Sequence, residues 1–179
     1  MTHNGPRVWH YTIAARLASI LADRMIRLES ITVAASGDRE ADHVDRGPGW
    51  RPAVWGTLNS VFEPTAVKAI VDSEGWYVRN LTPEEMPDRC DLARIEVEPS
   101  ALPHNWTAYR RLSGLTASGA SLLAEVAKLH GSNLWEWRAS FEPVRDDHWI
   151  AVEVEKNGVW TPYATNFFDP ESLLPRPLK

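Results

Sequence analysis

The arrangement of short apolar runs is the feature that most constrains the fold of this chain. Runs typical of short β-strands lie at residues 7–11, 31–34, 53–57, 92–97, 139–144, 148–155 and 159–163. Helical spacing of apolar residues occurs from Ile13 to a stop near Arg27, at 64–71 and at 118–130. This order has no regular βαβ alternation with a Gly-rich turn, which disfavours a doubly wound nucleotide-binding fold. We therefore expect an α+β domain built on two small packed mixed sheets with few flanking helices.

Local signals mark where several of these elements end. Thr12 is the candidate N-cap of the first helix, and Gly131 is placed as the left-handed stop of the helix at 118–130. The residues KNG at 156–158 are typical of a hairpin turn. The polar stretch 36–52 predicts a long loop, and the Pro-rich tail at 170–179 predicts a surface arm.

Length and composition narrow the class of protein. At 179 residues the chain fits a single domain over 1–179, with its core over about 7–163. No apolar run reaches the roughly 18 residues of a membrane span, and the N-terminus has no basic-then-apolar leader. Because Cys90 is the lone cysteine, an internal disulfide framework is excluded. We expect a cytoplasmic protein with no membrane partner.

Charge and aromatic content bear on the partners. Nineteen Lys and Arg against 24 Asp and Glu give a formal net charge of −5. This balance argues against a general electrostatic grip on nucleic acid but leaves room for a local basic rim. The nine tryptophans are roughly three times what an ordinary composition gives. Because a buried indole N–H needs a partner, we expect many of them half-buried at a pocket or face.

Metal and cysteine chemistry find little support. A loop presents Asp42, His43 and Asp45 together, but such a triplet in a polar loop is usually solvated. Cys90 has no histidine near it in sequence and is expected to be inert. We expect no metal.

Two segments carry candidate chemistry, and each has a plain structural alternative. His10 lies at the end of the first strand, where its ring N–H can be offered to a ligand hydroxyl; the alternative is a satisfied, half-buried histidine. Glu142 interrupts the late strand-like run 139–144; the alternative is a solvent-facing strand glutamate on the same face as Ser140.

Taken together, several short motifs resemble the ADP-ribosyltransferase superfamily, in particular its compact bacterial, toxin-type (DarT-like) members. They are His10-Tyr11-Thr12 before a helix with Leu17, Ile20 and Leu21, then the strand Arg51-Pro52-Ala53-Val54-Trp55-Gly56-Thr57, and finally the late Glu142 before Pro143-Val144. The resemblance spans about residues 7–155. It implies an ADP-ribosyltransferase-like core and a reaction that splits NAD and transfers ADP-ribose, with NAD as a substrate.

The resemblance also implies roles for individual residues. His10, Tyr11 and Thr12 would bind NAD, with His10 on the ribose, while Trp55 and Thr57 would lie beside the nicotinamide. Arg51 would contact phosphate, and Glu142 would be the catalytic carboxylate. Two departures stand out: Gly56 replaces the usual aromatic, and Ser140 stands where arginine-modifying relatives have a second acid.

Three hypotheses follow. The first is an NAD-dependent mono-ADP-ribosyltransferase that modifies a macromolecule, protein or nucleic acid, as a toxin or phage-conflict effector with an antitoxin or immunity partner. The second is a catalytically inactive nucleotide- or peptide-binding module of the same fold. The third is a Trp-rich protein-interaction domain.

Overall fold

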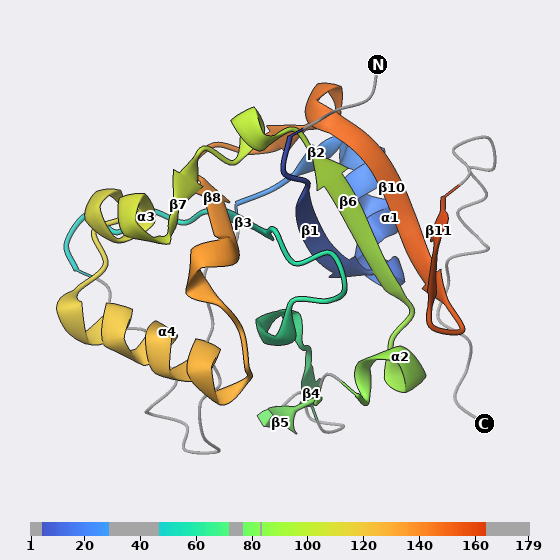
Figure 1. Ribbon diagram of the computed structural model, residues 1–179, viewed down its shortest axis with the longest axis horizontal. Helices are drawn as coiled ribbons and strands as arrows, with labels where there is room; N and C mark the ends of the chain where they lie inside the picture. The colour runs from blue at the N-terminus through green and yellow to red at the C-terminus, as the bar shows by residue number, and fades with distance from the viewer. Residues whose placement is uncertain (1–4, 29–46, 72–76, 83, 164–179) are drawn as a thin grey trace.

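A computed structural model describes residues 5–28, 47–71, 77–82 and 84–163 of the chain (Figure 1). The helices are α1 (Ala14–Asp23), α2 (Met86–Arg89), α3 (Trp106–Leu112) and α4 (Ala117–Leu129). The strands are β1 (Val8–Ile13), β2 (Met25–Ile26), β3 (Val54–Thr57), β4 (Ala69–Val71), β5 (Tyr77–Asn80), β6 (Leu92–Val97), β7 (His104–Asn105), β8 (Trp137–Ser140), β9 (Val144–Arg145), β10 (Trp149–Lys156) and β11 (Val159–Pro162). The expected α+β class is confirmed.

One seven-stranded sheet organises the fold, in the order β11-β10-β6-β1-β3-β8-β7, and all of its neighbouring strands are antiparallel. Two two-stranded sheets, β2-β9 and β4-β5, lie beside it. The prediction of two small packed mixed sheets was therefore wrong. The long antiparallel pairing of β6 with both β1 and β10 joins the early and late strands into one sheet.

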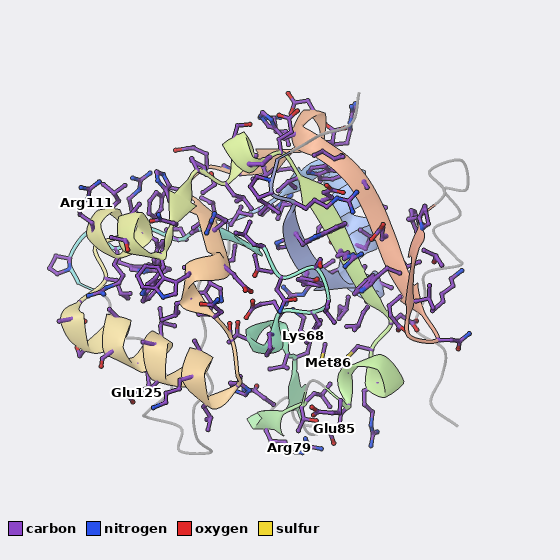
Figure 2. The ribbon with its side chains drawn as sticks, in the orientation of Figure 1. Lys68, Arg79, Glu85, Met86, Arg111 and Glu125 are labelled. Atoms are coloured by element: carbon purple, nitrogen blue, oxygen red, sulfur yellow. The ribbon has the colours of Figure 1, made fainter. Side chains whose placement is uncertain are left out.

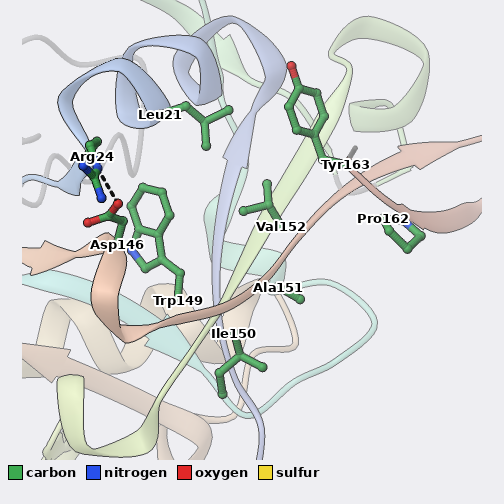
Figure 3. A pocket seen from close by; sticks show the side chains of 9 residues that line it. All are labelled: Leu21, Arg24, Asp146, Trp149, Ile150, Ala151, Val152, Pro162 and Tyr163. Atoms are coloured by element: carbon green, nitrogen blue, oxygen red, sulfur yellow. Dashed lines mark hydrogen bonds and ion pairs between the residues drawn. The ribbon is translucent and has the colours of Figure 1, made fainter. Parts of the chain in front are cut away.

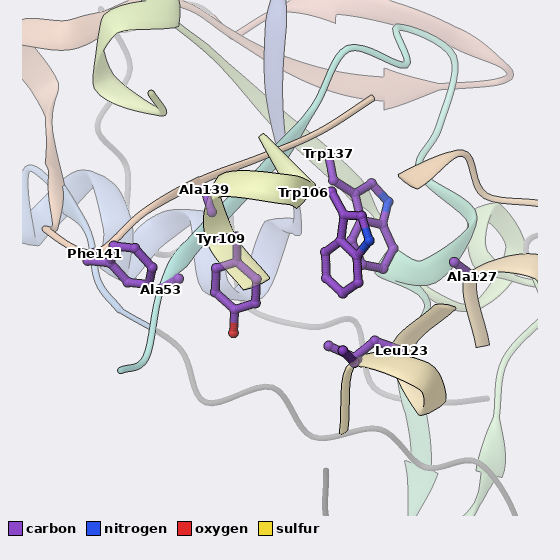
Figure 4. Packing of buried hydrophobic residues seen from close by; sticks show 9 residues of the cluster. Ala53, Trp106, Tyr109, Leu123, Ala127, Trp137, Ala139 and Phe141 are labelled. Atoms are coloured by element: carbon purple, nitrogen blue, oxygen red, sulfur yellow. The ribbon is translucent and has the colours of Figure 1, made fainter. Parts of the chain in front are cut away.

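The two faces of this sheet bury different clusters. On the face that we call the α1 face, Val8, Ile95 and Val54 pack with Leu17 of α1. On the opposite face, which we call the α4 face, Trp137 of β8 packs with residues of α3 and α4, as Figure 4 shows for Trp106 and Leu123. Strand alternation explains the division, because successive side chains point to opposite faces.

A smaller layer formed by β4, β5 and α2 covers the α4 face near the start of β6. Leu81 and Met86 of this layer are buried against Leu92 of β6. An exposed ion pair between Arg79 and Glu85, both labelled in Figure 2, joins β5 to the start of α2. Nη1 of Arg79 lies 2.6 Å from Oε2 of Glu85.

Most of the predicted elements are present. The runs at 7–11, 53–57, 92–97, 148–155 and 159–163 fall on strands. The helix predicted at 118–130 is α4, which is capped by the side chain of Thr116 and followed by Gly131 at a φ of +71°. The predictions for 31–34, for 36–46 in the long loop and for the arm at 170–179 lie outside the described residues.

Several predicted boundaries were wrong. Thr12 is a residue of β1, and Ile13 occupies the N-cap of α1 without a side-chain bond. The first helix ends at Asp23, because Arg24 adopts a left-handed conformation and its N–H bonds back to the last turn. The helix predicted at 64–71 is a short 3-10 helix, Pro64–Ala66, followed by β4.

The strand expected over 139–144 ends early. β8 stops at Ser140, whose hydroxyl donates to the carbonyl of Glu142 and accepts from its N–H, and Pro143 has no N–H for a ladder. Glu142 therefore lies in a bend and not in a strand. The helix α3 was not predicted; Asn105 caps it by accepting from the N–H of Ala108.

Gly56 packs where a side chain has no room. A Cβ atom there would lie 2.5 Å from Cδ1 of Leu102 and 3.1 Å from the carbonyl oxygen of Trp9. We predict that Gly56→Ala lowers the free energy of unfolding by about 1–3 kcal/mol through overpacking. Urea denaturation measures this, and Gly5→Ala, where nothing lies within 4 Å, is the control. Equal stability of the two variants would contradict the close packing at Gly56.

Candidate functional site

The candidate site is the place where β1 and β3 part. β1 pairs with β6 over six residue pairs, whereas the described parts of β1 and β3 pair at one position, Trp9 opposite Thr57. Beyond it the side chain of His10 joins the strands, with its Nδ1 2.8 Å from the carbonyl oxygen of Trp55. A side chain thus holds the strands together where a regular ladder would use backbone groups.

The bond to Trp55 fixes the protonated nitrogen of His10. A carbonyl oxygen only accepts, so Nδ1 is the donor. In the neutral ring Nε2 is then an acceptor, and a ligand hydroxyl would donate to it. This direction is the opposite of the one that the sequence predicts.

Alternation along β1 sends the predicted ligand residues to different faces. His10 and Thr12 lie on the same side of β1 as Val8 of the α1-face core, and both are buried. Tyr11 lies on the α4 face, where its ring contacts Phe62 edge-on at a centroid distance of 5.4 Å. The structure therefore gathers these residues around one strand but does not place them on one surface.

Trp55 and Thr57 lie on the α4 face of β3. The indole of Trp55 makes edge contacts with Tyr109 and Trp137, at centroid distances of 4.4 and 5.5 Å. Within the described part of the chain its buried N–H has no hydrogen-bond partner. The hydroxyl of Thr57 accepts from the backbone N–H of Asn59 at 3.1 Å, so it also shapes the turn after β3.

The segment that follows β3, residues 58–63, crosses back over the α4 face; we call it the crossing segment. Three side chains of the sheet donate to its successive carbonyls. Tyr11 of β1 donates to Asn59 at 2.8 Å, Arg94 of β6 to Ser60, and Trp160 of β11 to Val61 at 3.2 Å. These bonds fix the segment across three separate strands.

A buried charge lies beneath the crossing segment. The guanidinium of Arg94 is held between the rings of Trp9 and Trp160, 3.8 and 4.2 Å from their centroids. Its Nη2 lies 2.5 Å from Oε2 of Glu153, the residue opposite it on β10. Sequence reasoning missed this cluster; its only signal was the alternation of Arg94 with apolar residues in 92–97.

Burial raises the pKa of Tyr11 to about 12. Loss of solvent around the phenol is the largest cause, the charge of Arg94 opposes it, and the carboxylates of Glu63 and Glu153 add to it. Tyr11 is therefore a neutral donor to Asn59 at physiological pH.

Arg51 and Glu142, the predicted phosphate and catalytic residues, are brought together. Nη2 of Arg51 lies 3.8 Å from Oε1 of Glu142, and the two side chains are 49% and 82% exposed. The guanidinium of Arg51 also lies 4.2 Å from the ring centroid of Phe141. An exposed pair of this kind contributes about 0–1 kcal/mol to stability, so either partner is easily drawn to a ligand.

Glu142 and His10 do not contact each other. Trp9, Thr57 and Trp137 form one row across the sheet; His10 lies one residue beyond this row and Glu142 five. Strand geometry offsets Ser140, the last residue of β8, from His10 by roughly 7 Å along the strands and by two spacings of about 4.8 Å across them, and Glu142 follows in the bend beyond Ser140. A ligand that uses both residues must span this distance.

An open groove of about 610 Å³ lies elsewhere, on the α1 side of β10 (Figure 3). Leu21 of α1 and Trp149, Val152 and Tyr163 line it, and the ion pair of Arg24 with Asp146 closes one end. None of the seven predicted site residues belongs to its lining.

The described residues offer neither a metal site nor a reactive thiol. They contain no group of three His, Cys, Asp or Glu side chains that could hold a metal, and Asp42, His43 and Asp45 lie outside them. Burial raises the pKa of the Cys90 thiol, which makes it a poor nucleophile at neutral pH. In the described part of the chain every helix is too short or too polar to span a bilayer.

Comparisons with family models, with curated proteins and with solved structures give no match to this chain. The geometry of its own residues therefore carries the functional argument.

The pKa of Tyr11 predicts how stability depends on pH. Below pH 10 the phenol is protonated in both states; between about pH 10 and 12 the unfolded chain releases the proton first, so the free energy of unfolding falls as pH rises. We expect Tyr11 to account for a loss of about 1–1.5 kcal/mol by pH 11, which Tyr11→Phe lacks, whereas the fall caused by the raised pKa of Cys90 is common to both proteins. Urea denaturation at pH 8, 10 and 11 measures it, and equal pH slopes for the two proteins would contradict the burial of Tyr11.

Proposed function

We propose that the chain is an NAD-dependent mono-ADP-ribosyltransferase with an ADP-ribosyltransferase-like core, acting on a macromolecular acceptor in the cytoplasm. The observation that carries the proposal is the divergence of β1 from β3. β1 contributes His10, Tyr11 and Thr12 to this place, and β3 contributes Trp55 and Thr57. These are the residues to which the family resemblance assigns NAD. A bond between His10 and Trp55 already links the two sets.

The proposed reaction breaks the bond between C1′ of the ribose and the nicotinamide nitrogen. Nicotinamide leaves with the bonding electron pair, and a nucleophilic atom of the acceptor bonds to C1′ of the cationic sugar. The carboxylate of Glu142 would stabilise that cation and take the proton that the acceptor loses. The fork of Arg51 suits the pyrophosphate of NAD.

The exposure of Arg51 and Glu142 supports a large acceptor. With 82% of its side chain exposed, Glu142 can be approached by a protein side chain or a nucleotide that could not enter a closed pocket. Their 3.8 Å ion pair is weak enough for phosphate to replace it. As a toxin or phage-conflict effector, such an enzyme would need an antitoxin or immunity partner in its own cell.

The offset between His10 and Glu142 favours a second candidate. A nucleotide- or peptide-binding module of the same fold would use the residues around the divergence and leave Glu142 as a surface partner of Arg51. It would bind without turnover.

Incubation with NAD and measurement of nicotinamide release and labelled transfer tests the proposal. We expect Glu142→Gln to lower the rate by about 10²–10³, the cost of removing a preorganised charge from a reacting centre. The control is Glu125→Gln, on the outer surface of α4, which we expect to act like the wild type (Figure 2).

Three results would decide between the candidates. Wild-type turnover by Glu142→Gln would remove its catalytic role. Saturable quenching of tryptophan fluorescence by NAD, without nicotinamide release, would support the binding module. Neither binding nor turnover by the wild type would contradict both.

A further inference from the structure

Glu63, the last residue of the crossing segment, is a carboxylate in the interior. The residue is 7% exposed, although Glu is rarely buried unless it is paired. Its Oε1 accepts from the N–H and hydroxyl of Thr65, at 3.3 and 2.8 Å, and from the hydroxyl of Ser132. Ser132 in turn accepts from the indole N–H of Trp137 at 2.9 Å. A chain of hydrogen bonds thus runs from Trp137 through Ser132 to Glu63.

The second oxygen of Glu63 has no donor within the described part of the chain. A buried carboxylate oxygen without a partner is costly, and such groups in native proteins call for an explanation. Capping the 3-10 helix does not supply one, because the cap bonds from Thr65 use Oε1 and leave Oε2 unexplained. The carboxylate also reaches beyond the local turn, since it accepts from the hydroxyl of Ser132.

Glu63 connects the two halves of the α4 face. Its own segment is held over β1 and β6 by Tyr11 and Arg94, whereas Ser132 lies in the connection between α4 and β8. The charge of Glu63 is felt at Tyr11, whose pKa it helps to raise. The carboxylate is therefore anchored to both sides of the divergence between β1 and β3.

Trp137, at the other end of the hydrogen-bond chain, packs against Trp55 and Trp106, and we call these three rings the tryptophan wall. The ring of Trp137 meets that of Trp55 edge-on at 5.5 Å, and that of Trp106 edge-on at 5.6 Å (Figure 4 labels Trp106 and Trp137). Because the bond from Nε1 to Ser132 sets the rotation of the Trp137 ring, it also sets how Trp55 can lie.

We propose that Glu63 is a positioning residue of the nucleotide site proposed above, on which this role rests: through Ser132 and Trp137 it holds the indole of Trp55 in the orientation against which the planar ring of the ligand stacks. Oε2 of Glu63 is buried and Oε1 is bonded to Thr65 and Ser132, so Glu63 acts through these side chains and not by touching the ligand. Charge-assisted hydrogen bonds in a network strengthen one another, which suits a carboxylate better than an amide at this position.

Two variants test the two links of this chain. Ser132→Ala breaks it and keeps the carboxylate of Glu63, whereas Glu63→Gln keeps one acceptor oxygen, replaces the other with a donor NH2 group and removes the charge. Glu136→Gln is the matched control, since this glutamate lies in the same stretch and its Oε1 accepts from Asn133. The readouts are near-ultraviolet circular dichroism, which reports tryptophan packing without any ligand, and the KM and kcat for nicotinamide release from NAD.

We expect Ser132→Ala and Glu63→Gln to change the near-ultraviolet spectrum while the far-ultraviolet spectrum stays native. We expect each to raise KM for NAD by about tenfold with little change in kcat, the loss of roughly one hydrogen bond's worth of binding. Glu136→Gln should match the wild type in both readouts.

Wild-type spectra and wild-type KM in both test variants would overturn the role of Glu63. A fall in kcat with unchanged KM would also overturn it, since that pattern belongs to a group acting on the reacting atoms. If the wild type shows no reaction or binding with NAD, the proposed function fails and the ligand part of this role fails with it. The spectra of the variants then still decide whether Glu63 holds the tryptophan wall.

Discussion

The hydrogen bond from His10 to the carbonyl of Trp55 holds two strands together at the point where their backbone pairing stops. It allows β1 and β3 to belong to one sheet and yet to diverge. Gly56, on the α1 face, lets β3 approach Leu102 and the backbone of Trp9 more closely than a side chain would allow. The candidate site depends on this divergence, since it lies between residues of both strands.

The α4 face is kept in shape by polar groups as much as by apolar packing. Arg94, between two indoles and paired with Glu153, gives β6 a donor for the crossing segment. Breaking such a buried pair typically costs about 3–5 kcal/mol, so the place of the crossing segment depends on both partners. Glu63 ends the same segment and ties it to Trp137 through Ser132. Structural and proposed functional groups therefore share one network.

The sequence was sufficient to predict the elements that are set by residues close to one another in the chain. Helix α4 and the hairpin of β10 and β11 follow from periodicity and from turn residues, and they form as expected. Tertiary contacts decided the rest. Alternation marks the side of β6 that carries Arg94, which would be a solvent face in an ordinary strand, but Trp9 and Trp160 cover it from other parts of the chain. Likewise, a side-chain bond from Ser140 ended the strand on which Glu142 was expected.

The central claim is that the divergence of β1 and β3 is where NAD binds. An NMR titration of the isotope-labelled protein with NAD tests it most directly, because each site reports separately. We predict saturable shifts of the His10 ring nitrogens and of the amides of Tyr11 and Trp55, with the groove at Trp149 unaffected. Shifts confined to Trp149 and Tyr163, or none at all, would contradict it.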